Sequence, residues 1–562
     1  MIKSIKYISI FIVMICFALP VHAEVYTVSS ESQLEGAVAS VLPGDTVLLA
    51  AQSWNNVELE FIGEGTEKLP IVFGAETPGK TILTGNSRIE ISGNWLVVRD
   101  LVFQDGNITD EGSIIAFRTN SSTFAHNCRV TNVSIEDYNP EDSSLDTKYV
   151  SLYGTYNRVD HCSLSGKTNS GATLVVWLDE TPDYHLIDHN YFGPRQDLGV
   201  NGGETIRIGT SDWESYSSNC VVEYNLFDEC DGEIEIISNK SVGNHYRYNT
   251  FTHCEGTLTL RHGSDCRVYG NFFFGDNQKN CGGIRVIGPG HRVFNNYLEN
   301  LEGTSYRAAI CLMNGVPNSP ANRYRQVDDA QVGFNTIINC KEPFAIGAGV
   351  SDELSLTPIN SQIENNLIVS RSGRKLVNEY SSAEGVTWRA VYTDAEDIGI
   401  SADGFVQTEL PMENDGQMYR PSSTNPVLGA ALEGAFDTLL VDIDGQTRPE
   451  TGKDVGCDQY STDEETIFPL SRDEVGANFD VATSSAIIEV PDYSVVLNDG
   501  KLKMGFADEA ERMVSIFSAD GKLLSRFQVQ TQSFEKQVGH LPHFFIVNIQ
   551  EINNQYAIKL IQ

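Results

Sequence analysis

The chain repeats one short motif, seen as Val222-Glu-Tyr-Asn-Leu-Phe, then as Tyr246-Arg-Tyr-Asn-Thr-Phe and again as Val268-Tyr-Gly-Asn-Phe-Phe. Related copies begin at positions 159, 187, 293, 332 and 363. Each copy is short, alternates in polarity and is bounded by turn residues, which is typical of a β-strand. The shared asparagine falls at positions 190, 225, 249, 271, 296, 335 and 366.

The spacing of these asparagines indicates a solenoid. Successive distances along the chain are 35, 24, 22, 25, 39 and 31 residues. The shortest values correspond to one coil, and the longer values to a coil plus a loop insertion. No helical pattern separates the copies, which excludes a βαβ sheet. The sequence therefore predicts an all-β protein, a right-handed parallel β-helix. We expect each asparagine at a tight bend, in the left-handed conformation, bonded to its counterpart in the next coil.

The ends of the chain differ from this repeat. Residues 1–23 have the pattern of a secretory signal, with Lys3 and Lys6 before an apolar run and a cleavage site after Ala23. We therefore expect export to the periplasm, the cell surface or the medium. The β-helix is predicted over residues 24–457, with an N-terminal capping helix that starts after Ser30.

The C-terminal part is predicted as two further segments. Residues 458–480 are polar and read as a linker. Residues 481–562 contain an Asp-Gly hairpin and further strand patterns, which predict a small β-sandwich. This part resembles the C-terminal sorting or attachment modules of exported proteins.

Composition narrows the function classes. With 39 basic and 76 acidic residues, the formal net charge is −37, which argues against a nucleic-acid partner. No segment after the signal is long and apolar enough to span a membrane.

Among the 11 cysteines, Cys230, Cys254 and Cys340 each follow a motif asparagine by five residues. We interpret these as equivalent core positions holding free thiols rather than disulfides.

The densest group of chemically useful residues lies between positions 231 and 240. Glu233 and Glu235 are two apart on a predicted strand and should face the same side, with Ile234 between them facing the core. Two adjacent carboxylates repel unless a cation or a proton lies between them, and oxygen ligands of this kind suit Ca²⁺. Asn201 and Glu204 lie about one coil earlier and could join the pair. The alternative is a solvated acidic edge on a strongly acidic protein.

Lys240 and Arg261 form the second part of this group. They are 21 residues apart, close to one coil, so we expect them side by side on neighbouring strands. A neutral amine held there could act as a base, although both cations could instead pair with the glutamates. From residue 240 to 292 the chain holds seven basic and three acidic residues, a local positive strip that suits a polyanion.

Three stretches of the sequence around these residues resemble polysaccharide lyase family 6, which contains chondroitinase B and alginate lyases. They are Glu233-Ile-Glu-Ile-Ile-Ser-Asn-Lys-Ser, Leu260-Arg-His-Gly and Asn271-Phe-Phe-Phe-Gly. The resemblance covers roughly residues 25–375. It implies that Lys240 is the catalytic base, that Arg261 is its partner, and that Ca²⁺ is held by Asn201, Glu233 and Glu235. The form Asn201-Gly-Gly-Glu204 is similar to the alginate-lyase members, which adds Glu204 to the metal group.

The resemblance predicts a secreted lyase that cleaves alginate by Ca²⁺-assisted β-elimination and leaves a 4,5-unsaturated uronate at the new non-reducing end. One alternative is a dermatan sulfate lyase. Another, from a different class, is a non-catalytic polysaccharide-binding β-helix. A proton donor such as Tyr246 is considered, and His262 is expected on the strand face opposite Arg261. The candidate substrate contacts are Arg207, Tyr246, His262, Lys279, Arg285 and Arg307.

Overall fold

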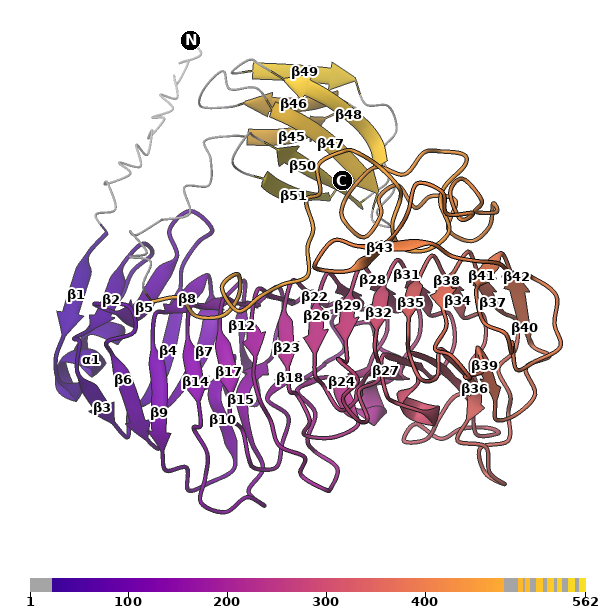
Figure 1. The fold of residues 1–562 in the computed structure, drawn as a ribbon. Helices are drawn as coiled ribbons and strands as arrows, with labels where there is room; N and C mark the ends of the chain where they lie inside the picture. Colours follow the sequence, from indigo (N-terminus) through magenta and orange to yellow (C-terminus); the bar gives the residue numbers. More distant parts are fainter. Residues whose placement is uncertain are drawn as a thin grey trace, which may run out of the picture.

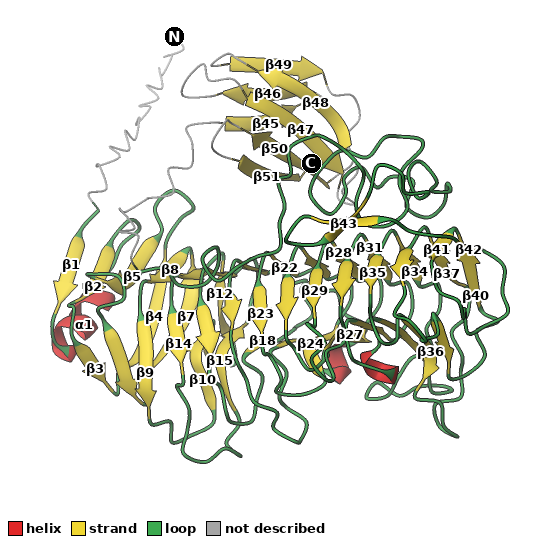
Figure 2. Ribbon diagram, viewed as in Figure 1, coloured by secondary structure: helices red, strands yellow, loops and turns green. Residues whose placement is uncertain are grey.

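The computed structural model describes residues 23–479 and seven strands between residues 494 and 561. Its main body is a parallel β-helix built from three long sheets (Figure 1). The chain visits the sheets in turn, so consecutive strands of one sheet come from successive coils. Figure 2 shows how little helix accompanies the strands. The predicted solenoid is confirmed.

The first sheet follows the repeated motif along most of its length. In spatial order it comprises β1 (Val25–Val28), β2 (Thr46–Leu49), β5 (Ile71–Ala75), β8 (Leu96–Arg99), β13 (Arg129–Thr131), β16 (Arg158–Asp160), β19 (Leu186–Asp188), β22 (Val221–Glu223), β25 (His245–Arg247), β28 (Arg267–Tyr269), β31 (Arg292–Phe294), β34 (Gln331–Gly333), β37 (Ser361–Glu364) and β40 (Val386–Arg389).

The second sheet carries the residues that matter most for function. It comprises β11 (Arg118–Asn120), β12 (Thr123–His126), β7 (Arg88–Asn94), β10 (Gly112–Ala116), β15 (Thr147–Leu152), β18 (Leu174–Val176), β21 (Ile206–Ile208), β24 (Glu235–Lys240), β27 (Thr257–His262), β30 (Ile284–Val286), β33 (Ile310–Met313), β36 (Phe344–Ala348) and β39 (Val377–Glu379), with β4 (Glu58–Glu64) paired to β7.

The third sheet closes the coil. It comprises β3 (Ser53–Asn55), β6 (Ile82–Gly85), β9 (Val102–Gly106), β14 (Ser134–Glu136), β17 (Ser163–Ser165), β20 (Tyr191–Phe192), β23 (Leu226–Asp228), β26 (Thr250–Thr252), β29 (Phe272–Phe274), β32 (Tyr297–Glu299), β35 (Thr336–Ile338), β38 (Leu367–Val369), β41 (Val391–Thr393) and β42 (Phe405–Gln407).

The core consists of stacked columns of apolar side chains. In the first sheet Val222, Tyr246, Val268 and Val293 are directly opposite one another in successive strands, and each is at most 1% exposed. Burial of such a column in every coil supplies most of the driving force for stacking.

An asparagine ladder links the coils, as the repeat predicted. The side-chain oxygen of Asn225 accepts hydrogen bonds from the backbone and the side chain of Asn190, at 2.9 and 3.0 Å. The same pair of bonds recurs from Asn225 to Asn249 and onward to Asn366. All of these asparagines are buried, so their role is structural.

The expected backbone conformation was wrong by one residue. The left-handed residue is the one before each asparagine, for example Tyr224 (φ 52°) and Tyr248 (φ 55°). This position turns the corner between the first and third sheets, whereas the asparagine that follows turns inward to bond the next coil.

The N-terminal cap has the predicted form. The helix α1 spans Glu31–Val38, and the Ser30 side chain accepts a hydrogen bond from the backbone of Gln33. Leu34 and Ala37 are buried against the first coil. The helix therefore shields the open end of the core. The predicted signal over residues 1–23 falls almost entirely outside the described residues.

All ten cysteines in the described part of the chain are buried free thiols. The backbone N–H of Cys230 lies 3.4 Å from the Cys254 sulfur, which places these two residues at equivalent positions in neighbouring coils. The prediction of core thiols rather than disulfides is confirmed for them.

The segment predicted as a linker, residues 458–480, is packed against the β-helix as far as Phe479, its last described residue. After β42 the chain forms a hairpin of β43 (Met412–Asn414) and β44 (Tyr419–Pro421). It then runs back along the third sheet, where Leu470 donates to the Thr250 hydroxyl and Ala477 to the Ser163 hydroxyl. Because this return segment lies over the third sheet, the outer face of the second sheet remains open.

The seven C-terminal strands form two antiparallel sheets. One comprises β45 (Ser494–Asn498), β46 (Lys501–Gly505) and β49 (Ser533–Gln537). The other comprises β47 (Arg512–Ser518), β48 (Leu523–Val529), β50 (Phe544–Gln550) and β51 (Gln555–Ile561). The strands on either side of the predicted Asp-Gly turn, β47 and β48, pair antiparallel, whereas the turn itself lies outside the described residues. Packing of the two sheets as a sandwich stays a prediction. In the described residues, no helix is long and apolar enough to cross a membrane.

Candidate active site

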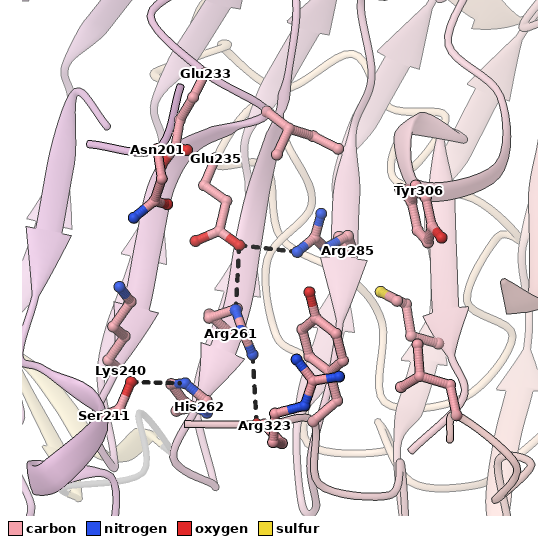
Figure 3. Close-up of a pocket in the computed structure, with 14 residues that line it drawn as sticks. Asn201, Ser211, Glu233, Glu235, Lys240, Arg261, His262, Arg285, Tyr306 and Arg323 are labelled. Carbon is pink, nitrogen blue, oxygen red and sulfur yellow. Dashed lines mark hydrogen bonds and ion pairs between the residues drawn. The ribbon is translucent and has the colours of Figure 1, made fainter. Parts of the chain in front are cut away.

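A pocket of about 590 Å³ lies on the outer face of the second sheet (Figure 3). Its floor and walls come from β24, β27 and β30 and from loops that overhang them. The lining residues are Asn201, Ser211, Glu233, Ile234, Glu235, Lys240, Arg261, His262, Arg285, Tyr306, Met313, Arg323, Tyr324 and Leu354. Ile234, which we expected in the core, is among them.

Sheet register explains how Arg285 reaches the pocket. Ser238 on β24 is opposite Thr259 on β27, and Thr259 is opposite Arg285 on β30. Ser238 and Thr259 are fully buried and do not line the pocket, whereas the longer Arg285 side chain does. Strand alternation in a parallel sheet thus places Arg285 on the same face as Ser238 and Thr259, where it forms part of the pocket wall.

A bulge brings more side chains to the pocket than alternation allows. The pairing of β24 with β27 shifts after Asn239, so that Lys240 is opposite His262 rather than Arg261. Both Arg261 and His262 consequently line the pocket, which corrects the expectation that His262 points to the other face. Bulges are frequent next to functional sites because they redirect a side chain.

Two glycines bring the predicted acidic residues together. A Cβ on Gly203 would lie 2.0 Å from the Gly232 carbonyl oxygen, and a Cβ on Gly232 would lie 2.2 Å from the Gly203 oxygen. The backbones preceding Glu204 and Glu233 therefore touch. The buried Arg195 donates to the carbonyl of Glu204 at 2.7 Å and holds this loop in place.

Glu204 and Glu233 keep unsatisfied oxygens. Glu204 is 1% exposed, yet its Oε2 has no hydrogen-bond partner, and neither has Oε1 of Glu233. Burial, followed by the charges of Glu204 and Glu235, raises the pKa of Glu233 to about 8. Lys240 approaches this pair, with Nζ 3.6 Å from Glu204 Oε1. Buried acceptors without donors favour a bound cation.

Glu235 differs from Glu204 and Glu233 because both of its carboxylate oxygens have partners. Its Oε1 accepts a hydrogen bond from Arg285 Nη2 at 2.8 Å and lies 3.5 Å from Arg261 Nε, and its Oε2 accepts from Ser238. Both oxygens are thus occupied by side chains. Of the two glutamates that the sequence paired, Glu233 has an oxygen free for a ligand and Glu235 holds the arginines.

Arg261 lies at the centre of the pocket. Its guanidinium carbon lies 3.9 Å from the centre of the Tyr324 ring, and Nη1 donates to the Arg323 carbonyl at 3.4 Å. Burial lowers the pKa of Arg261, and Glu235 opposes that shift. Contacts on several sides fix the orientation of this cation.

His262 is buried between polar neighbours. Nε2 lies 3.2 Å from the Ser211 hydroxyl, and Nδ1 lies 3.5 Å from Glu214. Burial and then the charges of Arg261 and Lys240 lower its pKa to about 3. The imidazole is therefore neutral and a weak base, which suits orientation better than proton transfer.

The other predicted contacts have varied positions. Tyr246 is in the core, fully buried, and its hydroxyl donates to Asn239 at 2.7 Å, so it does not reach the pocket. Lys279 is exposed in the turn after β29 and Arg307 lies in the 3₁₀ turn η2 (Ser305–Arg307), both outside the lining. Arg207 is on β21, beside the pocket. Of the six, Arg285 and His262 line it.

Sequence reasoning missed the residues that cover the pocket. Tyr306 comes from η2, and Arg323 and Tyr324 come from the loop between β33 and β34. The available signal was the 39-residue gap between Asn296 and Asn335, because an inserted loop must lie over a neighbouring surface. That signal identifies the insertion but not the residues that reach the pocket.

The pocket combines fixed cations, a lysine amine and a buried acidic pair on an exposed parallel β-helix sheet. Such an arrangement can bind an anionic sugar chain and move a proton, which defines a class of carbohydrate-active β-helix proteins. The model of the family described as chondroitinase B matches residues 28–432. The chain belongs to this family, polysaccharide lyase family 6.

Solved structures agree with this assignment. A family 6 alginate lyase, AlyGC, is 37% identical with a TM-score of 0.72, and the match covers 81% of this chain and 58% of that one. The chain thus spans little more than half the length of AlyGC. A mannuronic-acid-specific family 6 lyase from human gut microbiota is 31% identical, with a TM-score of 0.63 and coverages of 69% and 92%.

A third solved structure extends the likeness. The family 6 lyase Pedsa3628 from Pseudopedobacter saltans is 25% identical, with a TM-score of 0.61 and coverages of 80% and 99%. No curated protein matches the chain.

Proposed function

We propose that the protein is an exported lyase that cleaves alginate by β-elimination in the pocket around Lys240. One observation carries the proposal: the Lys240 amine and the fixed guanidinium of Arg261 line the same pocket, beside a buried pair of carboxylates. The second nearby base, His262, has a pKa of about 3 and is a weak competitor. Lys240 is then the group best suited to accept a proton.

The reaction begins at C5 of a uronate unit. Lys240 takes the C5 proton, and negative charge develops on the neighbouring carboxylate. Arg261 is the lining cation that would offset this charge, because Arg323 is paired with Glu353. Arg285 is held by Glu235 at 2.8 Å and keeps Arg261 and Glu235 in register rather than serving as a free anion site.

Cleavage follows when the C4–O bond breaks and the C4=C5 double bond forms. The leaving oxygen needs one proton. Tyr246 cannot supply it because its hydroxyl is buried and bonded to Asn239. The ammonium formed on Lys240 is the acid that the reaction itself creates in the pocket, and we assign the proton to it. Arg261 remains a charge-stabilising group, since guanidinium is a poor acid.

We further propose Ca²⁺ as cofactor. Asn201, Glu204 and Glu233 would hold it, because both glutamates have buried oxygens without partners and all three offer hard-oxygen ligands. When bound, the ion would neutralise and orient the uronate carboxylate. Glu235 fits this role less well than the sequence suggested, since arginines and Ser238 occupy its oxygens.

Alginate is favoured as substrate by the named activities of the similar structures, AlyGC and the mannuronic-acid-specific lyase. Dermatan sulfate is the alternative, since the matching family model is described as chondroitinase B. A non-catalytic binding protein would not need the bulge that brings Lys240 and His262 together.

The direct test offers alginate and dermatan sulfate separately to the purified protein and follows ultraviolet absorbance of the unsaturated uronate. We expect absorbance to rise with alginate. A rise only with dermatan sulfate would replace the substrate, and binding without any rise would support the non-catalytic alternative.

A further inference from the structure

A second hollow, of about 240 Å³, lies on the same outer face as the pocket, several coils toward the N-terminus. It is lined mainly by β10, β15 and the residues that follow β15 and β18. Its side chains include Arg118, Lys148, Tyr153 and Trp177, together with the acidic Glu111 and Asp146. The reaction described above uses none of them.

Aromatic rings form a stack beside this hollow. Tyr153 stacks on Phe124 and on Trp177, each with centroids 6.1 Å apart and planes within 11°. The guanidinium carbon of Arg118 lies 4.1 Å from the centre of the Tyr153 ring, and that of Arg207 lies 5.1 Å from the Trp177 ring. The ring faces are thus covered, so the stack holds cations in place rather than offering faces to a ligand.

The cations beside the hollow retain capacity to bind an anion. The buried Nε of Arg207 has no hydrogen-bond partner. The Lys148 amine lies 2.8 Å from Asp146 and 5.8 Å from the Trp177 ring, and it still has donors to spare. We call Arg118, Lys148 and Arg207 the distal cation site.

Register connects the distal cation site to the pocket. Ser151 on β15 is opposite Val175, Val175 is opposite Arg207, and Arg207 is opposite Ser238 on β24, the strand that also carries Lys240. The path from β15 to β24 is three strand steps, or about 14 Å at ~4.8 Å per step. Taking one sugar unit of an extended chain as about one strand step, roughly three units would bridge the two hollows.

Toward the N-terminus, the row of facing residues continues from Ser151 to Ala116 and ends in two glutamates. Ala116 is opposite Glu90, and Glu90 is opposite Glu60 on β4. Burial and the charge of Glu60 raise the pKa of Glu90. A polyanion would be repelled there, which gives the positive path an end.

We propose that the distal cation site is a remote subsite that binds carboxylates of the same uronate chain about three units from the bond that is cleaved. This rests on the proposed function. The site would make the protein favour long chains over short ones, because only a long chain reaches the pocket and the distal site together. Binding energy from the remote contact would add to that of the pocket.

The test compares kcat/KM on long uronate oligomers with kcat/KM on the trimer, for the wild type and for Arg118→Ala and Lys148→Ala. Each variant should lose about tenfold in the long-to-short ratio, the worth of one hydrogen bond to a charged group. Lys80→Ala is the control, since Lys80 is exposed in the turn between β5 and β6 and should leave the ratio as in the wild type.

Retention in gels that contain alginate supplies a readout independent of turnover. The wild type should be retarded more than either variant, with unchanged thermal unfolding. Wild-type ratios and retention in both variants would overturn the subsite. A wild type that yields no unsaturated product would instead overturn the proposed function, and gel retention would still decide the subsite.

Discussion

Two buried acidic clusters in this molecule look alike in sequence and differ in structure. Asp442, Asp444 and Asp458 each have a carboxylate oxygen within 4.8 Å of the others, and no other group of three acidic, His or Cys residues in the described part of the chain is that close. Burial raises the pKa of each to about 6. Yet this group is satisfied by the protein: Arg420 pairs with Asp444 and lies 3.4 Å from Asp458.

The backbone satisfies the remaining member of that trio. Asp442 accepts from the N–H groups of Gln446 at 2.8 Å and Gln459 at 3.0 Å. The cluster near the pocket differs, because Glu204 and Glu233 each keep a buried oxygen without a donor. The comparison teaches that proximity of carboxylates is a poor guide to a metal site. Unpaired oxygens discriminate better, since their desolvation is left uncompensated.

The largest expected effect on activity comes from removing the ion that we propose at Asn201, Glu204 and Glu233. Chelation should abolish or sharply reduce activity, and Ca²⁺ should restore it better than Mg²⁺ because the site offers several oxygens without a fixed octahedron. Ca²⁺ should also raise the Tm of the wild type but not that of Glu233→Gln, as followed by calorimetry. Full activity in metal-stripped protein would break the assignment.

A smaller effect is expected at the aspartate trio. Asp444→Ala removes one partner from the partly buried Arg420, which keeps Asp415, and should lower the free energy of unfolding by about 2 kcal/mol, the worth of a hydrogen bond to a charged group. Activity per folded molecule should persist, and the Ca²⁺-dependent rise in Tm should remain. Loss of that rise in Asp444→Ala would show that the trio, and not the pocket, binds the ion.

The smallest effect is expected from deletion of residues 481–562. The pocket lies within coils that stack on their own neighbours, and solenoid stability is close to a sum of neighbour terms. Both clusters and the return segment to Phe479 stay intact in that truncation. Activity on alginate should change little, and a folded but inactive truncation would show that the C-terminal strands shape the groove.

The sequence predicted those features that repeat. The asparagine spacing sufficed for the solenoid, because each coil obeys the same local rule. It also brought Glu233, Lys240 and Arg261 together, since one coil separates neighbouring strands. The core position of Tyr246 was within reach too, because it alternates with His245 and Arg247 in the same way that Val222 alternates with its neighbours.

Local departures from the repeat could not be predicted from the sequence. The bulge after Asn239 depends on how two strands accommodate one extra residue, and it alone turns His262 toward the pocket. Arg323 and Tyr324 come from an insertion whose path depends on contacts with Arg261. The packing of the return segment was not predicted, because its contacts are made with residues hundreds of positions earlier in the chain.

The most direct test of the account is the rate of Lys240→Arg on alginate, followed by absorbance of the unsaturated product. Arginine keeps the positive charge near Glu204 but holds its proton at working pH, so it can clamp a carboxylate and cannot act as base. The account predicts a loss of about 10²–10⁴-fold in rate, the usual worth of a positioned proton acceptor. Near-normal turnover would contradict it and leave Lys240 as a carboxylate clamp.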